Sequence, residues 1–382
     1  MNLIYLDNAS TTAIDSEVLD FMLPFLKNQY GNASSSTHFL GRNANAQIEM
    51  AREQIGNSLN AESSEIIFTS GATESINIAL QGIWENYHQK SKRIILSPTE
   101  HSAVIETCKF LERKKGAELI WLNVTREGEI DLIELEEALK TGSLLTCIMY
   151  ANNETGTINP IEKIGALCNE YNSLFFCDAT QAFGKINVDV VTDNIHALSI
   201  SSHKIYGPKG AGALYLKRKN PRVVVPPLFY GGSQEKGLRA GTMNVAAIAG
   251  FGKATEIAAT KRWEDALLTS KIRTRIEGCL GDLGNVHING SFKNRLPNIS
   301  NLLIGGVASK DLIKECSELA FSLGSACSSD SDKLSHVLVA MGLNNVEIKS
   351  SVRFSFGRFN TLEEAEKIIE ILTKAILKLR SL

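Results

Sequence analysis

The stretch 174–181, LFFCDATQ, decides the fold class, because a short and wholly apolar run ends there in the carboxylate of Asp178. Apolar runs of this length are typical of strands that are buried on both faces of a sheet. Similar runs recur from about residue 50 to residue 250, with helical stretches between them. They are residues 66–68, 94–96, 144–150, 197–200 and 213–216. This alternation predicts an α/β domain with a mostly parallel central sheet.

The pattern changes after about residue 260, where a charged helix over 261–280 leads into a smaller α+β segment. A final amphipathic helix is predicted over 362–379. A chain of 382 residues is suited to one large domain and a smaller one. We therefore predict a large domain of residues 15–260 and a small domain built from residues 1–14 and 261–382.

Composition limits the possible classes of protein. Hydrophobic residues make up 43% of the chain and charged residues 21%, which is enough to bury a full core. The net charge of -2 gives no bulk attraction to nucleic acid or to an anionic membrane. No apolar run approaches the roughly 20 residues needed to cross a bilayer, and the first residues lack the pattern of a secretory signal. Seven widely spaced cysteines without a C-x-x-C pair indicate reduced thiols, so we expect a cytoplasmic protein without a zinc site or direct nucleic-acid binding.

Two residues at strand ends suggest a cofactor. Asp178 ends one apolar run, and Lys204 follows a later one in the sequence SSHK. Taken singly, the aspartate would be a helix cap and the lysine a solvated surface residue. Together they fit pyridoxal phosphate, whose ring nitrogen needs a carboxylate partner and whose aldehyde bonds to a lysine amine.

Three other stretches end strands in the same region. Residues 68–75, FTSGATES, predict a turn followed by a helix that begins near Thr73. The N-terminus of such a helix can bind an anion, although a sequence of this kind more often forms an ordinary capped helix. His101 follows the run 94–96 and is a candidate for ring stacking and proton transfer. Residues 152–156, NNETG, are equally typical of a plain turn. Neither a Walker A loop nor a G-x-G-x-x-G after a strand is present, which argues against a nucleotide site.

The most discriminating stretch is 324–332, GSACSSDSD, which contains Cys327. A cysteine among Gly, Ser and Asp is expected to be exposed and mobile, as a nucleophile that moves between two places must be. The other six cysteines lie in apolar or helical contexts, where a structural role is expected.

These motifs, in this order, resemble the cysteine desulfurases of the NifS/IscS type, which have the fold-type I architecture of pyridoxal-phosphate enzymes. The resemblance covers nearly the whole chain, from 5–12 (YLDNASTT) to 353–359 (RFSFGRF). Between these ends lie SGATES, TEH, NNE, DATQ, HKIYGPKG and GSAC. Two motifs depart slightly from the family pattern, SSHK for SGHK at 201–204 and SLGSACSS for SSGSACTS at 322–329, and both keep every reactive group.

The resemblance implies roles for individual residues. Lys204 is the lysine that bonds to the cofactor, Asp178 pairs with the ring nitrogen, His101 stacks on the ring, and Gln181 contacts the ring hydroxyl. The phosphate and the substrate are assigned to a second set. The phosphate-binding positions are Ala72, Thr73, Ser201 and His203, and Thr242 of the other subunit joins them. Arg353 and Asn153 hold the substrate carboxylate. Asn153 also borders the cofactor.

The implied activity is the conversion of L-cysteine to L-alanine by a homodimer, with the sulfur taken up as a persulfide on Cys327. An acceptor protein would then receive the sulfur, as an iron–sulfur scaffold or another sulfur carrier does, and Cys327 could ligate an iron–sulfur cluster transiently. The chain ends at Leu382, without the extended tail by which housekeeping members grip their scaffold, which leaves the acceptor open.

Three alternatives remain at this stage. An aminotransferase or a selenocysteine lyase would share Lys204 and Asp178 but would not need Cys327. A sulfur-carrier module would need Cys327 but not Lys204. The same chemistry could also supply sulfur for tRNA thiolation or for DNA phosphorothioation. Three stretches of this chain, 32–38, 181–185 and 227–232, also resemble the desulfurases of DNA phosphorothioation.

Overall fold

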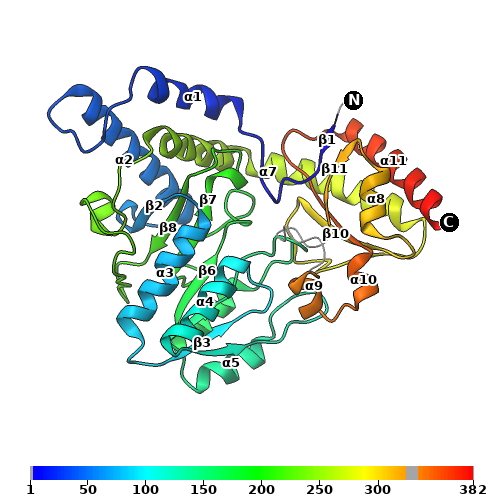
Figure 1. The fold of residues 1–382 in the computed structure, drawn as a ribbon, viewed down its shortest axis with the longest axis horizontal. Coiled ribbons are helices and arrows are strands. Elements are labelled where there is room, and N and C mark those ends of the chain that lie inside the picture. The colour runs from blue at the N-terminus through cyan, green and yellow to red at the C-terminus, as the bar shows by residue number, and fades with distance from the viewer. Residues whose placement is uncertain (1–2, 324–333, 382) are drawn as a thin grey trace.

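The computed structural model describes residues 3–323 and 334–381, and a seven-stranded sheet forms the centre of the larger part (Figure 1). The strand order is β2-β8-β7-β6-β5-β3-β4. Neighbours from β4 to β7 run parallel, and only β8 is reversed relative to the strands beside it. The strands are β2 (Ile66–Thr69), β3 (Arg93–Leu96), β4 (Glu118–Trp121), β5 (Leu145–Cys147), β6 (Leu174–Asp178), β7 (Ala197–Ser201) and β8 (Gly212–Leu216).

The predicted mostly parallel α/β sheet is confirmed, and each predicted run contains a strand. The run 144–150 is longer than its strand, since only Leu145–Cys147 pairs as β5. Strand β4 was not predicted. It lies at the edge of the sheet with both end residues exposed, so its sequence ELIW lacks the wholly apolar character of the central strands.

Both faces of this sheet are buried, which explains the continuous apolar runs. In β6, Phe175 packs with one helical layer and Phe176 with the other, because successive side chains point to opposite faces. Helices α3 (Ala72–Tyr87) and α4 (Ser102–Lys115) cover the face of Phe176. The opposite layer consists of α2 (Phe39–Leu59), α5 (Leu132–Lys140), α6 (Ile161–Glu170) and the first half of α7 (Val245–Gly281).

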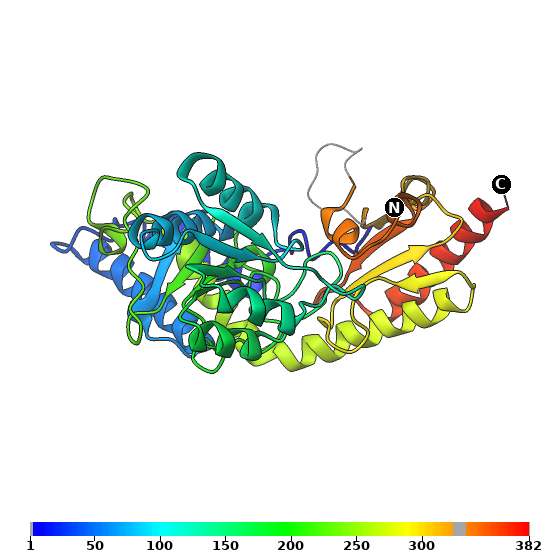
Figure 2. The same ribbon diagram turned by 90° about the horizontal axis from the view of Figure 1, so that it is seen from below.

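Helix α7 is the long connection to the rest of the chain, and Figure 2 shows it running from the large sheet to a smaller one. The helix predicted over 261–280 therefore starts too late. Its first half is rich in Ala and Gly and is buried almost all round, so it carries no amphipathic pattern that would mark it as a helix. The predicted domain boundary at residue 260 falls inside α7, and the division into two domains stays a prediction.

The smaller sheet is antiparallel, with the order β12-β13-β10-β9. Helices α8 (Ser309–Glu315) and α11 (Leu362–Arg380) pack against it together with the second half of α7. The last helix agrees with the prediction over 362–379. The strands are β9 (Val286–Ile288), β10 (Ile299–Ile304), β12 (Ser322–Leu323) and β13 (Ser351–Ser355).

The N-terminal segment joins this smaller part. Strand β1 (Ile4–Tyr5) pairs in parallel with β11 (Leu319–Ala320), and Asp7 forms a bridge with Ser355. The chain then passes into the large part and begins α1 (Ser16–Lys27). The short helices α9 (His336–Ala340) and α10 (Asn345–Lys349) complete the described fold, in which no helix of residues 3–323 or 334–381 is suited to crossing a membrane.

A buried arginine ties these segments together. The Arg358 guanidinium donates to Asp15 at 2.7 Å and to Asp265 of α7 at 2.7 Å. It also lies 4.4 Å from the centre of the Tyr206 ring, and the Arg358 backbone N–H donates to the Tyr206 hydroxyl at 2.7 Å. Since Tyr206 lies two residues after Lys204, this cluster connects α1, α7 and the C-terminal part to the segment that carries the predicted catalytic lysine.

We predict that Arg358→Met lowers the free energy of unfolding by about 3 to 5 kcal/mol, because it leaves two aspartates without their cation, and Asp15 is buried. Arg275→Met is the matched control. Arg275 also forms a two-pronged ion pair from α7, with Glu366, but both side chains are more than half exposed, so no measurable change is expected. Urea unfolding of the two variants measures the difference, and equal losses would contradict this role of Arg358.

Candidate active site

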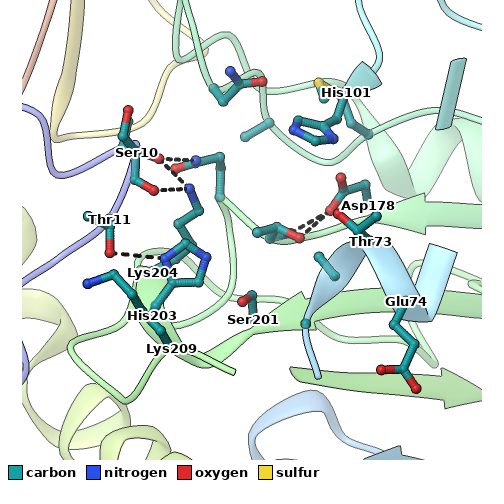
Figure 3. Close-up of a pocket in the computed structure, with 18 of the residues that line it drawn as sticks. Ser10, Thr11, Thr73, Glu74, His101, Asp178, Ser201, His203, Lys204 and Lys209 are labelled. Carbon is teal, nitrogen blue, oxygen red and sulfur yellow. Dashed lines mark hydrogen bonds between the residues drawn. The ribbon is translucent and has the colours of Figure 1, made fainter. Parts of the chain in front are cut away.

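A cavity of about 550 Å³ lies beyond the carboxyl ends of β2, β6 and β7 (Figure 3). Open α/β sheets bind ligands at this edge, since polar groups from several strand ends converge there. Ten of the residues predicted from the sequence line the cavity. They are Ala72, Thr73, His101, Asn153, Asp178, Gln181, Ser201, His203, Lys204 and Arg353.

Asp178 ends β6 and is held from one side. Its Oδ1 accepts from the backbone N–H of Thr180 at 3.0 Å, from the Thr180 hydroxyl, and from the Ser199 hydroxyl at 3.1 Å. All the hydrogen bonds recorded for this carboxylate within the described residues go to Oδ1. The carboxylate is therefore fixed in place with Oδ2 left to pair with a cationic ring nitrogen.

The N-terminus of α3 forms an anion cradle. Gly71 precedes the helix and, within the described part of the chain, no side chain caps it, so backbone N–H groups of Ala72 and Thr73 remain for a ligand. Strand β8 passes so close to this turn that position 212 must be glycine, because a Cβ on Gly212 would lie 2.5 Å from the Gly71 Cα. Ser201 and His203 line the same cavity.

Lys204 follows β7 in a short 3-10 helix, and its amine reaches the N-terminal segment. Nζ donates to the carbonyl oxygens of Ala9 at 2.7 Å and Ser10 at 2.6 Å. His203 beside it contacts the Thr11 hydroxyl at 3.1 Å through Nδ1. Burial, with Lys204 and other lysines nearby, lowers the pKa of His203 to about 4, so this ring is neutral at pH 7.

His101 caps α4, and its Nδ1 accepts from the Ala103 backbone N–H at 3.1 Å. An Nδ1 that accepts leaves the proton of a neutral ring on Nε2. Burial lowers the pKa of His101 and outweighs the opposing effect of Asp178. The ring is thus a neutral group that faces the cavity and can exchange a proton at Nε2.

Arg353 lies in β13 with its side chain almost completely buried. One terminal nitrogen donates to the Asn153 carbonyl oxygen at 2.9 Å, and the other contacts Asp7 and donates to Ser10 Oγ at 2.7 Å. Its Nε has no hydrogen-bond partner among the described residues. A buried orphan donor beside a cavity is expected to bind a ligand group, and a carboxylate suits a guanidinium.

Glu154 follows Asn153 and is fully buried. Its Oε2 accepts from the Ser335 hydroxyl, which precedes α9, and its backbone carbonyl accepts from Asn301 at 3.2 Å. Burial raises the pKa of Glu154 to about 7, against the lowering effects of Ser335 and Arg353. Glu154 therefore changes charge near neutral pH at the turn that carries Asn153.

One predicted residue of the described part of the chain is not brought to this cavity. Thr242 is exposed and does not line it, in keeping with a residue expected to act on the other subunit. Cys327 lies outside the described residues. Sequence reasoning missed the lining residues of the N-terminal segment, Ala9, Ser10 and Thr11, whose contribution is mostly through backbone carbonyls that any residue type would supply.

Four of the described cysteines are poor nucleophiles. Five of them are buried and Cys279 is partly exposed. Burial raises the pKa of Cys168 to about 12 and that of Cys316 to about 11, and it raises the pKa of Cys147 and Cys177 well above the ordinary value. Thiolates are disfavoured at these four positions at neutral pH.

The cavity residues fit pyridoxal phosphate. An uncapped helix N-terminus suits the phosphate, a carboxylate fixed through one oxygen suits the ring nitrogen, and the Lys204 amine suits the aldehyde. Among the described residues, no group of three or more His, Cys, Asp or Glu side chains is arranged to hold a metal ion. Fold and site together define a pyridoxal-phosphate-dependent enzyme.

The chain belongs to the class-V aminotransferase family, whose pattern it matches over residues 4–368. It is 42% identical over 381 residues to the cysteine desulfurase IscS of Buchnera aphidicola subsp. Baizongia pistaciae, which covers 99% of this chain and 94% of that protein. A solved NifS-like protein superposes with a TM-score of 0.91 at 36% identity, over the full length of both chains. The structure of SspA in complex with cysteine superposes with a TM-score of 0.81 at 35% identity, over 94% of this chain and all of SspA. These findings confirm the predicted family and fold class.

We predict that Glu154→Gln stabilises the protein at about pH 8 but not at about pH 5. The folded pKa of about 7 exceeds the ordinary value of 4.5, so the wild type holds this proton more tightly when folded, and its stability falls as pH rises between these values. Gln removes the buried charge and still accepts from Ser335, with an expected gain of about 1 to 3 kcal/mol at the higher pH.

Urea unfolding at both pH values measures this gain. Glu53→Gln, which removes an exposed carboxylate from α2, is the control and should show no such pH dependence. A gain for Glu154→Gln that is equal at both pH values would contradict the raised pKa.

Proposed function

We propose that this protein takes sulfur from L-cysteine as a persulfide on Cys327 and passes it, in the cytoplasm, to an acceptor protein for iron–sulfur cluster assembly. The enzyme is a pyridoxal-phosphate-dependent cysteine desulfurase, as its full-length similarity to IscS indicates. The observation that carries the proposal is the convergence of Lys204, Asp178, His101 and Arg353 on one cavity.

Substrate binding is assigned to Arg353 and Asn153. The Arg353 Nε lacks a partner among the described residues, and its guanidinium is already anchored to the Asn153 carbonyl. A substrate carboxylate that accepts from Nε would set the amino group and the thiol of cysteine on the cavity side.

Proton transfer is assigned to Lys204 and His101. Bound pyridoxal phosphate would supply an electron sink that acidifies the substrate Cα–H. The Lys204 amine, held near the floor of the cavity by two carbonyl oxygens, takes that proton. His101 exchanges a proton with the substrate thiol at Nε2, and Asp178 would pair with the ring nitrogen of the bound cofactor through Oδ2.

Sulfur transfer is assigned to Cys327. Its thiolate attacks the substrate sulfur, so an S–S bond forms while the Cβ–S bond breaks. The electron pair of the broken bond stays with the substrate carbon, which takes up a proton to give the methyl group of alanine. The balance is one cysteine and one enzyme thiol in, and one alanine and one enzyme persulfide out. The raised pKa values of four buried cysteines support this choice of nucleophile.

We predict that Cys327→Ala abolishes persulfide and alanine formation but leaves the protein yellow with bound cofactor. The residues that hold the cofactor and the substrate are unchanged, so the defect is in catalysis rather than in binding. Mass spectrometry of the persulfide and an alanine assay on each Cys→Ala variant measure this outcome.

Cys316→Ala is the matched control, since this thiol is buried and its pKa is raised, and it should retain activity. Lys204→Ala should lose alanine production for a different reason, because no amine remains to bond to the cofactor. Alanine production by Cys327→Ala at the wild-type rate, or a persulfide on Cys316, would exclude the mechanism. Transfer of labelled sulfur to a purified iron–sulfur scaffold tests the acceptor.

We predict a homodimer with shared active sites, because Thr242 is exposed in the single chain and matches a residue that reaches the partner's phosphate. Thr242→Ala should weaken cofactor binding about tenfold, as expected for the loss of one hydrogen bond to a charged group. Sedimentation and cofactor titration measure both properties. A stable monomer with full activity would rule out the shared site.

A further inference from the structure

Lys185 lies behind the cofactor cavity rather than in it. The cavity is lined by Gln181, and Lys185 is one turn further along the chain. The Lys185 Nζ donates to the Gln181 side-chain oxygen Oε1 at 2.9 Å and to its backbone oxygen at 3.1 Å. Lys185 instead borders a second, very small cavity of about 20 Å³, which it shares with Lys204. Its amine can therefore act on the main cavity only through other residues.

The Gln181 amide has two ends of opposite character. Its oxygen only accepts and its nitrogen donates two N–H groups, so the orientation of the amide decides what Gln181 offers to a ligand. Here Nε2 donates to the Ala9 carbonyl at 2.8 Å, the same carbonyl that accepts from Lys204. One N–H of Nε2 is used in this contact, and the second remains for a ligand in the cavity.

The lysine and the Ala9 carbonyl determine this orientation together, one at each end of the amide. A Lys185 ammonium has donors only, so the amide end that faces it must be the oxygen. Burial, with Lys204 and Arg353 nearby, lowers the pKa of Lys185 to about 7. The neutral amine still carries two N–H groups, enough to donate both hydrogen bonds to Gln181. The contact is therefore available on either side of neutral pH.

We propose that Lys185 is a positioning residue that locks the Gln181 amide with Nε2 directed toward the cofactor cavity. This role rests on the proposed function in one respect, because the acceptor is taken to be the ring hydroxyl oxygen of pyridoxal phosphate. A hydrogen bond donated to that oxygen favours its anionic form, and the bound chromophore then loses its proton at a lower pH.

The test is the pH titration of the visible absorbance of the holoenzyme. Lys185→Met removes the donor that faces Oε1 and leaves the Ala9 contact alone to orient the amide, so we expect the spectral midpoint to rise by about 0.5 to 1 pH unit. Lys185→Arg keeps donors at this position and should restore a midpoint close to the wild-type value. Lys185→Gln, which keeps an N–H donor on a shorter and uncharged side chain, should give a smaller rise and serves as a second variant if Lys185→Met does not fold.

A double-mutant cycle separates positioning from the direct effect of charge. If Lys185 acts through the amide, Lys185→Met should produce little further shift in a Gln181→Leu background. An equal shift in both backgrounds would mean that the lysine charge acts directly on the cofactor, and this would overturn the proposal. Lys163→Met, which removes an exposed charge from α6, is the matched control and should leave the midpoint unchanged.

Two further outcomes are decisive. An unchanged midpoint in a folded, yellow Lys185→Met variant would overturn the role of Lys185 and leave the proposed function intact. A wild-type protein that stays colourless after reconstitution with pyridoxal phosphate would overturn the proposed function, and the role of Lys185 with it.

Discussion

The contact of the Lys204 amine with the carbonyl oxygens of Ala9 and Ser10 is the constraint on which the site depends. It brings the first residues of the chain to the carboxyl edge of a sheet whose strands come much later in the sequence. The same N-terminal segment pairs with the smaller part of the protein through β1. One segment thus links both sheets to the Lys204 amine, and the Arg358 cluster fixes where that segment continues into α1.

How much of the fold could be predicted depended on how each segment is buried. Strands with two covered faces, such as β6, show up as continuous apolar runs, and all of these were found. The edge strand β4 has only partial cover, so selection for apolar residues there is weaker. The first half of α7 is enclosed by other helices and has no polar face, so neither periodicity nor charge indicated where the helix starts.

Whether a residue of the site could be predicted depended on whether its side chain or its backbone lines the cavity. Residues that act through side chains at strand ends, such as Asp178 and Lys204, were predictable because the chemistry requires those residue types at that edge. The N-terminal residues Ala9 and Ser10 act through their carbonyl oxygens, which leave no trace in residue type. The contact of Lys185 with Gln181 was not predicted either, since it depends on the three-dimensional course of the turn after β6.

The surroundings of Arg353 show how substrate recognition is compatible with a buried charge. A lone buried guanidinium would be costly, and Asp7 compensates it by ion pairing before any substrate is bound. The hydroxyls of Ser10 and Ser322 both donate to Asp7 Oδ1, which spreads the negative charge and holds the carboxylate to one side. The Arg353 Nε has no hydrogen-bond partner among the described residues. Under the proposed function, a substrate carboxylate would therefore meet an arginine that is already held in place, and the N-terminal segment that contacts Lys204 is also the one that holds this arginine.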